Sequence, residues 1–256
     1  MLKLSIIMPA LNEEKHIGKA IDNTLQALND FGISGEIICI NDGSTDTTLE
    51  IIQAKKLIDS RVMYISHDVN KGFGFSFWNG VSIAKNEIVV LMPGDNENNP
   101  WEIFRYIGLL DSVDLVIPFV FNKNIRSKFR ILLSTIYRFI INLTFNTNLN
   151  YTNGTVLYRT ELLRDINYKS NGFFFQTDLL IRLIGQGYLF AEVPYRLEQN
   201  NGQITKALTY PSFKDVVYGY FILIKEHYFL NKEKMALNTN SISHVRINEK
   251  NRKMKV

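Results

Sequence analysis

Apolar strands and helix-like segments alternate through the first hundred residues, and this alternation limits the fold more than any other feature. In order, the segments are LSIIMP, NEEKHIGKAIDNTLQALNDFG, EIICIND, STDTTLEIIQAKKLID, VMYISHD, GFSFWNGVSIAKN and EIVVLMP. Successive parallel strands need a crossover connection, which is usually a helix. The strands are continuously apolar, as expected when helices cover both faces of a sheet. The pattern therefore predicts an α/β fold with a mainly parallel sheet flanked by helices.

The chain is expected to form one domain over residues 1–231, followed by a basic, disordered tail over residues 232–256. From Lys232 onward there are seven Lys or Arg residues and two Glu residues, a net charge of +5. The whole chain carries +4, so residues 1–231 carry about −1. A nearly neutral body argues against a nucleic-acid partner.

The N-terminal run MLKLSIIMPA is expected to be the first strand and not a signal peptide, because Pro9 interrupts it and the charged NEEKH follows at once. No stretch reaches the roughly 18 uncharged apolar residues of a spanning helix. The one cysteine, Cys39, lies inside the apolar run EIICI and is expected to be a small core residue. These features predict a cytoplasmic protein.

The segment RSKFRILLSTIYRFIINL has an apolar stripe at helical spacing with basic residues around it. The stripe contains Phe129, Leu132, Leu133, Ile136, Ile140 and Leu143, and the basic residues are Arg126, Lys128, Arg130 and Arg138. Such a helix suits contact with the inner face of a membrane. The stripe equally suits the core, with the aromatic-rich segment FKDVVYGYFILIKEHYF as its packing partner.

Polar residues directly follow each of the four predicted strands. They lie in four groups, residues 9–13, 41–46, 67–72 and 93–97. The carboxyl ends of the strands form the ligand crevice of an open parallel sheet. Each group alone is better explained by a turn or a helix cap, but the four together predict one site. Its carboxylates suit hydrogen bonds to a nucleoside and coordination of a divalent cation that holds a diphosphate.

The segments LSIIMPALNEE, EIICINDGSTDTT, NKGFGFSFWNG and VVLMPGD resemble glycosyltransferase family 2 in order and spacing. Further on, TNGTVLYRTELL, FFFQTDLLIRL and AEVPYR are similar to its polyprenyl-phosphate sugar synthase branch, the dolichyl-phosphate mannose synthase-like group. The resemblance implies a Rossmann-like GT-A fold and an inverting glycosyltransferase. The donor would be a nucleoside diphosphate sugar of UDP or GDP, and the acceptor a polyprenyl phosphate or a cell-envelope glycan.

The resemblance also assigns roles to single residues. Those expected to bind the nucleotide sugar are Pro9, Ala10, Asn12, Glu13, Asp42, Gly72, Gly94 and Asp95. Among these, Asp42 is expected to read the base and Gly72 to lie near the ribose and diphosphate. Asp95 and Glu97 are the expected ligands of Mg²⁺ or Mn²⁺, and Asp178 is the expected catalytic base.

This sequence departs from the family pattern at three places. Pro93 replaces the first aspartate of the D-x-D motif, and Asn41 replaces the first aspartate of the usual DDGS. The basic pattern after the last strand is reduced to Thr205 and Lys206.

Two other functions remain open. A nucleotidyltransferase also uses carboxylates at strand ends, but it needs a glycine-rich basic loop where this chain has the acidic ALNEEKH. A non-catalytic protein that binds nucleotide sugars would explain Pro93 and Asn41, and it would bind the donor without releasing nucleoside diphosphate.

Overall fold

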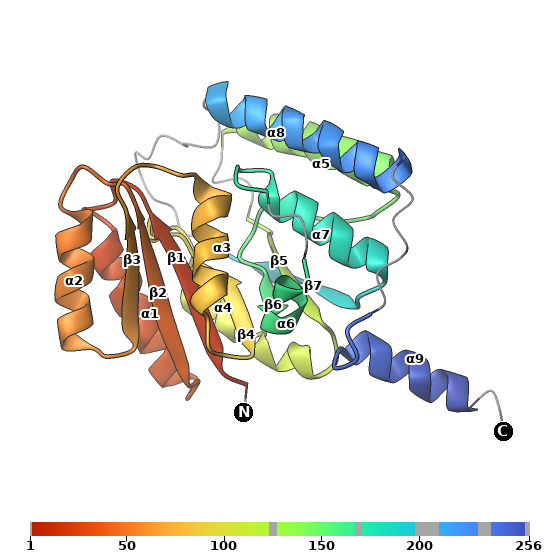
Figure 1. Cartoon of the computed structure of the whole chain (residues 1–256), viewed down its shortest axis with the longest axis horizontal. Helices are drawn as coiled ribbons and strands as arrows, with labels where there is room; N and C mark the ends of the chain where they lie inside the picture. Colours follow the sequence, from red (N-terminus) through yellow and green to blue (C-terminus); the bar gives the residue numbers. More distant parts are fainter. Residues whose placement is uncertain (1, 123–126, 167–169, 198–209, 230–236, 254–256) are drawn as a thin grey trace.

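The computed structural model describes residues 2–122, 127–166, 170–197, 210–229 and 237–253. Within these residues the strands form a seven-stranded sheet in the order β3-β2-β1-β4-β6-β5-β7 (Figure 1). Their bounds are β1 (Leu4–Ala10), β2 (Gly35–Asp42), β3 (Val62–His67), β4 (Ile88–Leu91), β5 (Leu115–Val120), β6 (Leu157–Arg159) and β7 (Phe190–Tyr195). Only β6 in this sheet runs antiparallel to its neighbours. The predicted mainly parallel α/β sheet is confirmed.

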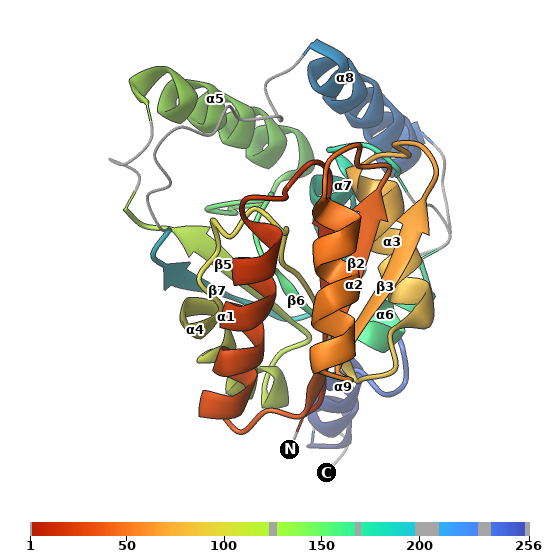
Figure 2. The ribbon, with the colours of Figure 1, turned by 90° about the vertical axis from the view of Figure 1, so that its left-hand side faces the viewer.

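Helices cover both faces of this sheet (Figure 2). One face carries α1 (Ile17–Asp30), α2 (Thr48–Ile58), α4 (Pro100–Phe104) and the 3₁₀ turn η1 (Ile107–Asp111). The other carries α3 (Phe73–Ile83), α6 (Thr160–Arg164) and α7 (Phe175–Gln186). Successive residues of a strand point to opposite faces. Accordingly, Ile6 of β1 lies in the first core and Ile7 in the second, and buried Cys39 joins the first.

Two long helices lie at the end of the molecule toward which β1, β2 and β3 run (Figures 1 and 2). They are α5 (Lys128–Phe145) and α8 (Tyr210–Ile224), and the π-helical turn η4 (Lys225–Phe229) continues α8. The C-terminal end of α5 is anchored, because Ile141 and Phe145 are buried and Thr144 is hydrogen-bonded to the Tyr220 hydroxyl at 2.7 Å.

The apolar stripe of α5 is not part of the core. All six stripe residues predicted from the sequence are exposed to solvent. The packing partner predicted for this stripe corresponds to α8 and η4. These two elements meet α5 near the C-terminal end of α5, through Tyr220 and Tyr228. The core alternative for this stripe is therefore wrong.

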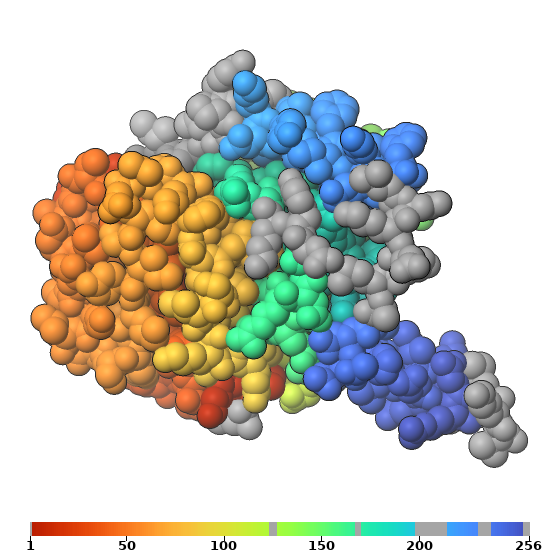
Figure 3. Space-filling model, viewed as in Figure 1, coloured from red at the N-terminus to blue at the C-terminus, as the bar shows by residue number. Residues whose placement is uncertain are grey.

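The C-terminal segment differs from the predicted disordered tail over residues 237–253. Helix α9 (Ile242–Lys253) begins at the fully buried carboxylate of Asp114, which accepts the backbone N–H groups of Ile242 at 2.8 Å and Ser243 at 3.2 Å. From there α9 projects beyond the body (Figure 3). Its composition is strongly polar, so nothing in the local sequence indicated that a distant buried aspartate fixes its start.

Candidate active site

The loops that follow β1 and β2 are joined by hydrogen bonds. The Asn12 backbone N–H donates to Ser44 Oγ at 3.0 Å, and Asn12 Oδ1 accepts from the Thr45 N–H at 2.8 Å. Next along the chain, the Glu13 N–H donates to Thr48 Oγ1 at 2.8 Å. Asn12 has a φ of 53°, a left-handed conformation that asparagine tolerates better than most residues. The two strand ends therefore form one connected rim.

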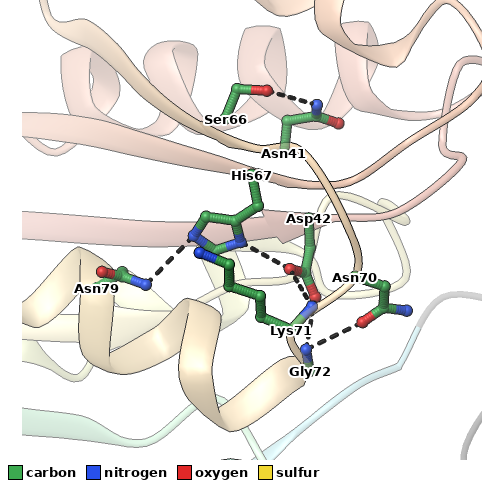
Figure 4. Close-up of polar contacts among 8 residues, drawn as sticks. All are labelled: Asn41, Asp42, Ser66, His67, Asn70, Lys71, Gly72 and Asn79. Atoms are coloured by element: carbon green, nitrogen blue, oxygen red, sulfur yellow. Dashed lines mark hydrogen bonds and ion pairs between the residues drawn. The ribbon is translucent and has the colours of Figure 1, made fainter.

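Asp42, the last residue of β2, is buried and holds the loop after β3 (Figure 4). Its Oδ1 accepts the Lys71 N–H at 2.9 Å and lies 2.7 Å from His67 Nδ1, while its Oδ2 accepts the Gly72 N–H at 2.9 Å. His67 Nδ1 is the donor in this contact when the carboxylate is ionised, because an ionised carboxylate can only accept. The other ring nitrogen of His67 lies 3.2 Å from Asn79 Nδ2. A carboxylate offers about four acceptor positions, and these contacts use three of them.

Two neighbours of Asp42 complete this corner. Gly72 has a φ of 104° and precedes α3, and its N–H is shared between Asp42 and Asn70 Oδ1. Asn41 donates from Nδ2 to Ser66 Oγ at 3.0 Å, whereas its buried Oδ1 has no hydrogen-bond partner in the described part of the chain. A buried acceptor without a donor is costly, so a ligand or water donor would stabilise this position.

The turn after β4 lies against β1. The Gly94 N–H donates to the Pro9 carbonyl at 2.9 Å. A Cβ on Gly94 would come within 2.6 Å of Ile17 Cδ1 and 3.2 Å of the Ala10 Cβ, so the close approach requires glycine. Pro9, Ala10 and Gly94 are thus brought together, as predicted from the four strand ends.

Asp95 and Glu97 extend this turn and are half-buried. Asp95 Oδ1 accepts the Glu97 N–H at 3.0 Å. Across the described ranges, no three His, Cys, Asp or Glu side chains gather into a metal-binding cluster. Mg²⁺ is commonly held by one or two carboxylates together with substrate phosphates. The donor set therefore fits a cation that arrives with a diphosphate, and does not fit a site formed by protein alone.

Asp178 lies in the first turn of α7 and is buried in an ionic network. Arg182 donates to both of its carboxylate oxygens at 2.9 Å and also binds Glu226 Oε2 of η4 at 2.6 Å. Burial raises the pKa of Asp178, although the pairing with Arg182 opposes the shift. Burial lowers the pKa of Arg182, but the pairing with Asp178 and Glu226 outweighs burial and raises this pKa overall. The two bonds from Arg182 use two of the about four acceptor positions of the Asp178 carboxylate.

A known protein family shares the sequence that forms this site. The sequence model described as "Glycosyl transferase family 2" matches residues 5–167, which include every strand end of the rim. The chain belongs to glycosyltransferase family 2. The predicted family and the predicted class of enzyme are thereby confirmed.

Among curated members of family 2, similar proteins are the undecaprenyl-phosphate 4-deoxy-4-formamido-L-arabinose transferases of Salmonella paratyphi B and Salmonella newport. Each is 29% identical over 143 residues, which are 56% of this chain and 44% of the relative. This chain therefore spans less than half of the length of these relatives. Their names agree with the predicted similarity to the polyprenyl-phosphate branch.

Solved structures of the glucosyl-3-phosphoglycerate synthase of Mycobacterium tuberculosis share the fold. The complex with UDP has a TM-score of 0.68 and 22% identity, and the match covers 87% of this chain and 80% of that one. A complex with Mn²⁺, UDP-glucose and phosphoglyceric acid has a TM-score of 0.67 and 18% identity, over 96% and 91% of the two chains. The predicted GT-A fold is confirmed.

The structure brings most of the predicted site residues of this family 2 chain to one edge. Hydrogen bonds or close contacts link three groups: Asn12 and Glu13 with the β2 loop, Asp42 with Gly72, and Gly94 with Pro9 and Ala10. Asp95 follows Gly94 directly and Glu97 lies two residues further on, whereas Asp178 is paired with Arg182 within α7, and Arg182 in turn binds Glu226 of η4. Thr205, Lys206 and Arg126 lie outside the described residues. Sequence reasoning missed the contacts of His67 and Asn79 with this site.

Proposed function

We propose that this chain transfers a sugar from a nucleoside diphosphate sugar to a polyprenyl phosphate. The observation that carries the proposal is the edge at the carboxyl ends of the strands, where the loop after Asp42 is bonded to the loop after β1 and the turn that leads to Asp95 is bonded to Pro9 through Gly94. The curated relatives are named for transfer to undecaprenyl phosphate, and solved structures of the same fold hold UDP with Mg²⁺ or Mn²⁺.

Asp42 is proposed to read the base. Three of its acceptor positions hold the loop of His67 to Gly72, and the fourth can accept the imino N–H of uracil or guanine. Pro9, Ala10, Asn12 and Glu13 are proposed to line the nucleoside pocket beside it. UDP in the structural neighbours favours uracil over guanine.

Asp95, with Glu97, is proposed to hold the divalent cation. When bound, Mg²⁺ or Mn²⁺ neutralises charge on the leaving diphosphate and lowers the barrier to breaking the sugar–phosphate bond. Gly94 serves this arrangement by keeping the carboxylate turn close to β1. Pro93 removes one carboxylate from the usual motif, so the phosphates of the donor supply more of the coordination.

The acceptor determines whether a base is needed. An ionised lipid phosphate attacks through an oxyanion and has no proton to remove, so inversion at the sugar proceeds without a general base. The engaged carboxylate of Asp178 is compatible with this acceptor. With a glycan hydroxyl, Asp178 stays the proposed base, because a positioned base typically contributes about 10²- to 10⁴-fold.

A small phosphorylated acid is the second candidate acceptor, because a structural neighbour was crystallised with phosphoglyceric acid. The exposed apolar side chains of α5, at the same end of the molecule as the rim, favour a lipid. The proposed place of the reaction is accordingly the cytoplasmic face of a membrane, in synthesis of the cell envelope.

Thermal shift measurements with UDP-, GDP- and CDP-sugars, each with Mn²⁺ or with EDTA, test the donor proposal. We expect a UDP- or GDP-sugar to raise the melting temperature with Mn²⁺ and the Asp95→Ala variant to lose that increment. Equal stabilisation in EDTA would contradict the metal role. Saturable binding without release of nucleoside diphosphate in the presence of acceptor would instead identify a binding protein, and pyrophosphate release from a nucleoside triphosphate would identify a nucleotidyltransferase.

A further inference from the structure

Helix α5 presents an apolar face to solvent, whereas the apolar face of a helix usually packs against the core. Its seven exposed apolar side chains lie between Phe129 and Leu143 at steps of three, one, three, three, one and three residues, which is the spacing of a core-facing stripe. Phe129 is 66% exposed, Phe139 is 65% exposed and Leu143 is 72% exposed. Contiguous apolar patches of this kind on a protein surface mark interaction sites.

Helix α8 adds to this face. Val217, Tyr218 and Phe221 are exposed on α8, and both views show the two helices at the same end of the molecule (Figures 1 and 2). We call the exposed apolar side chains of the two helices the α5–α8 surface. We propose that the α5–α8 surface docks on a lipid bilayer that carries anionic headgroups.

The charge of α5 indicates which partner covers the α5–α8 surface. Lys128, Arg130 and Arg138 give α5 three positive charges, and residues 128–145 contain no Asp or Glu. A second copy of this chain packed on α5 would bring like charges together at a desolvated interface. A bilayer accepts the apolar side chains and offers phosphates to the basic ones, which is the arrangement of interfacial amphipathic helices.

A hollow beside the stripe suits a lipid phosphate. It has a volume of about 360 Å³ and is lined by Arg138 and Phe139 of α5, together with Asn148 and Asn150 of the following loop. In the described part of the chain, the Arg138 guanidinium makes one long hydrogen bond, 3.4 Å to the Asn150 carbonyl. Arginine has five N–H donors, so this bond leaves donors for an anionic headgroup.

Docking at this surface would place the rim next to the bilayer. In both views α5 and α8 lie beyond the carboxyl ends of β1, β2 and β3, whereas α9 lies toward the other end (Figures 1 and 2). None of the helices that the structure describes is long and apolar enough to cross a membrane, so we infer that α5 lies on the bilayer without spanning it. The inference deepens the proposed function, since a polyprenyl phosphate acceptor resides in such a bilayer.

Flotation of the full chain with vesicles tests the proposal, without donor or acceptor present. We expect the protein to float with phosphatidylglycerol-rich vesicles and the Phe129→Ser/Phe139→Ser/Leu143→Ser variant to bind them at least about tenfold more weakly. Arg138→Gln should weaken binding about fivefold, and only to anionic vesicles. The matched control is Leu57→Ser/Ile58→Ser on α2, whose side chains are 89% and 80% exposed and lie outside the surface.

Three results would overturn the proposal. They are wild-type protein that does not float, a triple variant that floats like the wild type, and a triple variant that turns a wild-type dimer into a monomer in size-exclusion chromatography. The last would show that a second copy covers the surface. Because the vesicles hold no polyprenyl phosphate, failure here leaves the proposed reaction intact, and absence of sugar transfer leaves vesicle binding intact.

Discussion

Asp42 has two tasks at the scale of single residues. It fixes the loop after β3 and, in the proposed function, it reads the base. We expect Asp42→Ala to weaken nucleotide binding by about 1 to 3 kcal/mol, the range for hydrogen bonds to charged groups. The variant should also melt at a lower temperature, because the Lys71 N–H loses its acceptor and the Gly72 N–H keeps only Asn70 Oδ1. Calorimetric titration with the nucleotide measures the first effect, with Asp68→Ala, an exposed neighbour, as control. Unchanged affinity in a folded variant rejects the base-reading role.

Asp178 is expected to stabilise the folded state in addition to being the candidate base. From the sequence, Asp178→Asn is expected to slow transfer and leave the melting temperature nearly unchanged. The structure changes the second expectation, because the variant deprives Arg182 of one of its two carboxylates. We expect the free energy of unfolding in urea to fall by about 2 kcal/mol or more. Transfer to a polyprenyl phosphate by the folded variant should stay near the wild-type rate.

The control for this experiment is Glu50→Gln, an exposed carboxylate of α2. A folded Asp178→Asn variant with a rate about a hundredfold lower would restore Asp178 as the catalytic base.

Sequence reasoning reached the site residues that follow strands, because the end of a strand is visible as the end of an apolar run. It missed the bond between His67 and Asp42, which are 25 residues apart and meet only because β2 and β3 pair in register. The pair of Asp178 and Arg182 was readable, since residues four apart on a helix face each other. Its third member, Glu226, was not, because η4 approaches α7 from a distant part of the chain.

The turn after β4 shows how one element depends on another. Gly94 has no room for a side chain, since a Cβ would press on Ile17 of α1 and Ala10 of β1. We expect Gly94→Ala to lower the free energy of unfolding by about 1 to 3 kcal/mol, the usual cost of overpacking, and to weaken nucleotide binding by displacing Asp95. Urea unfolding and nucleotide titration measure the two effects.

Gly108→Ala in η1 is the matched control, because a Cβ there meets nothing within 4 Å. If Gly94→Ala were as stable as that control, the close packing of this turn would not be what positions Asp95.

Elements differed in how far the sequence could describe them. The strands and the helical extent of α5 followed from local apolar spacing. The surroundings of α5 did not, because a stripe at core spacing looks the same whether protein or solvent lies against it. Only the placement of α8, which meets α5 near one end, excluded the core alternative.

At the scale of the whole molecule, Asp114 attaches helix α9 to the body. Its carboxylate accepts the backbone N–H at the start of α9 and also the Leu189 N–H. We expect Asp114→Ala to release α9, so that backbone amides of residues 242–253 exchange hydrogen faster while those of β1 and β2 remain protected. Hydrogen exchange followed by mass spectrometry measures this, with Asp111→Ala as the exposed control. Equal exchange in both variants would show that other contacts hold the helix.

The most direct test of the account follows a labelled sugar from its nucleoside diphosphate donor in the presence of polyprenyl phosphate in detergent and Mn²⁺. We expect label to enter the organic phase with one nucleoside diphosphate released for each sugar transferred, and to remain in the aqueous phase with Asp95→Ala or EDTA. Transfer to a small phosphorylated acid with none to the lipid, or binding of the donor without any transfer, would contradict the proposed reaction.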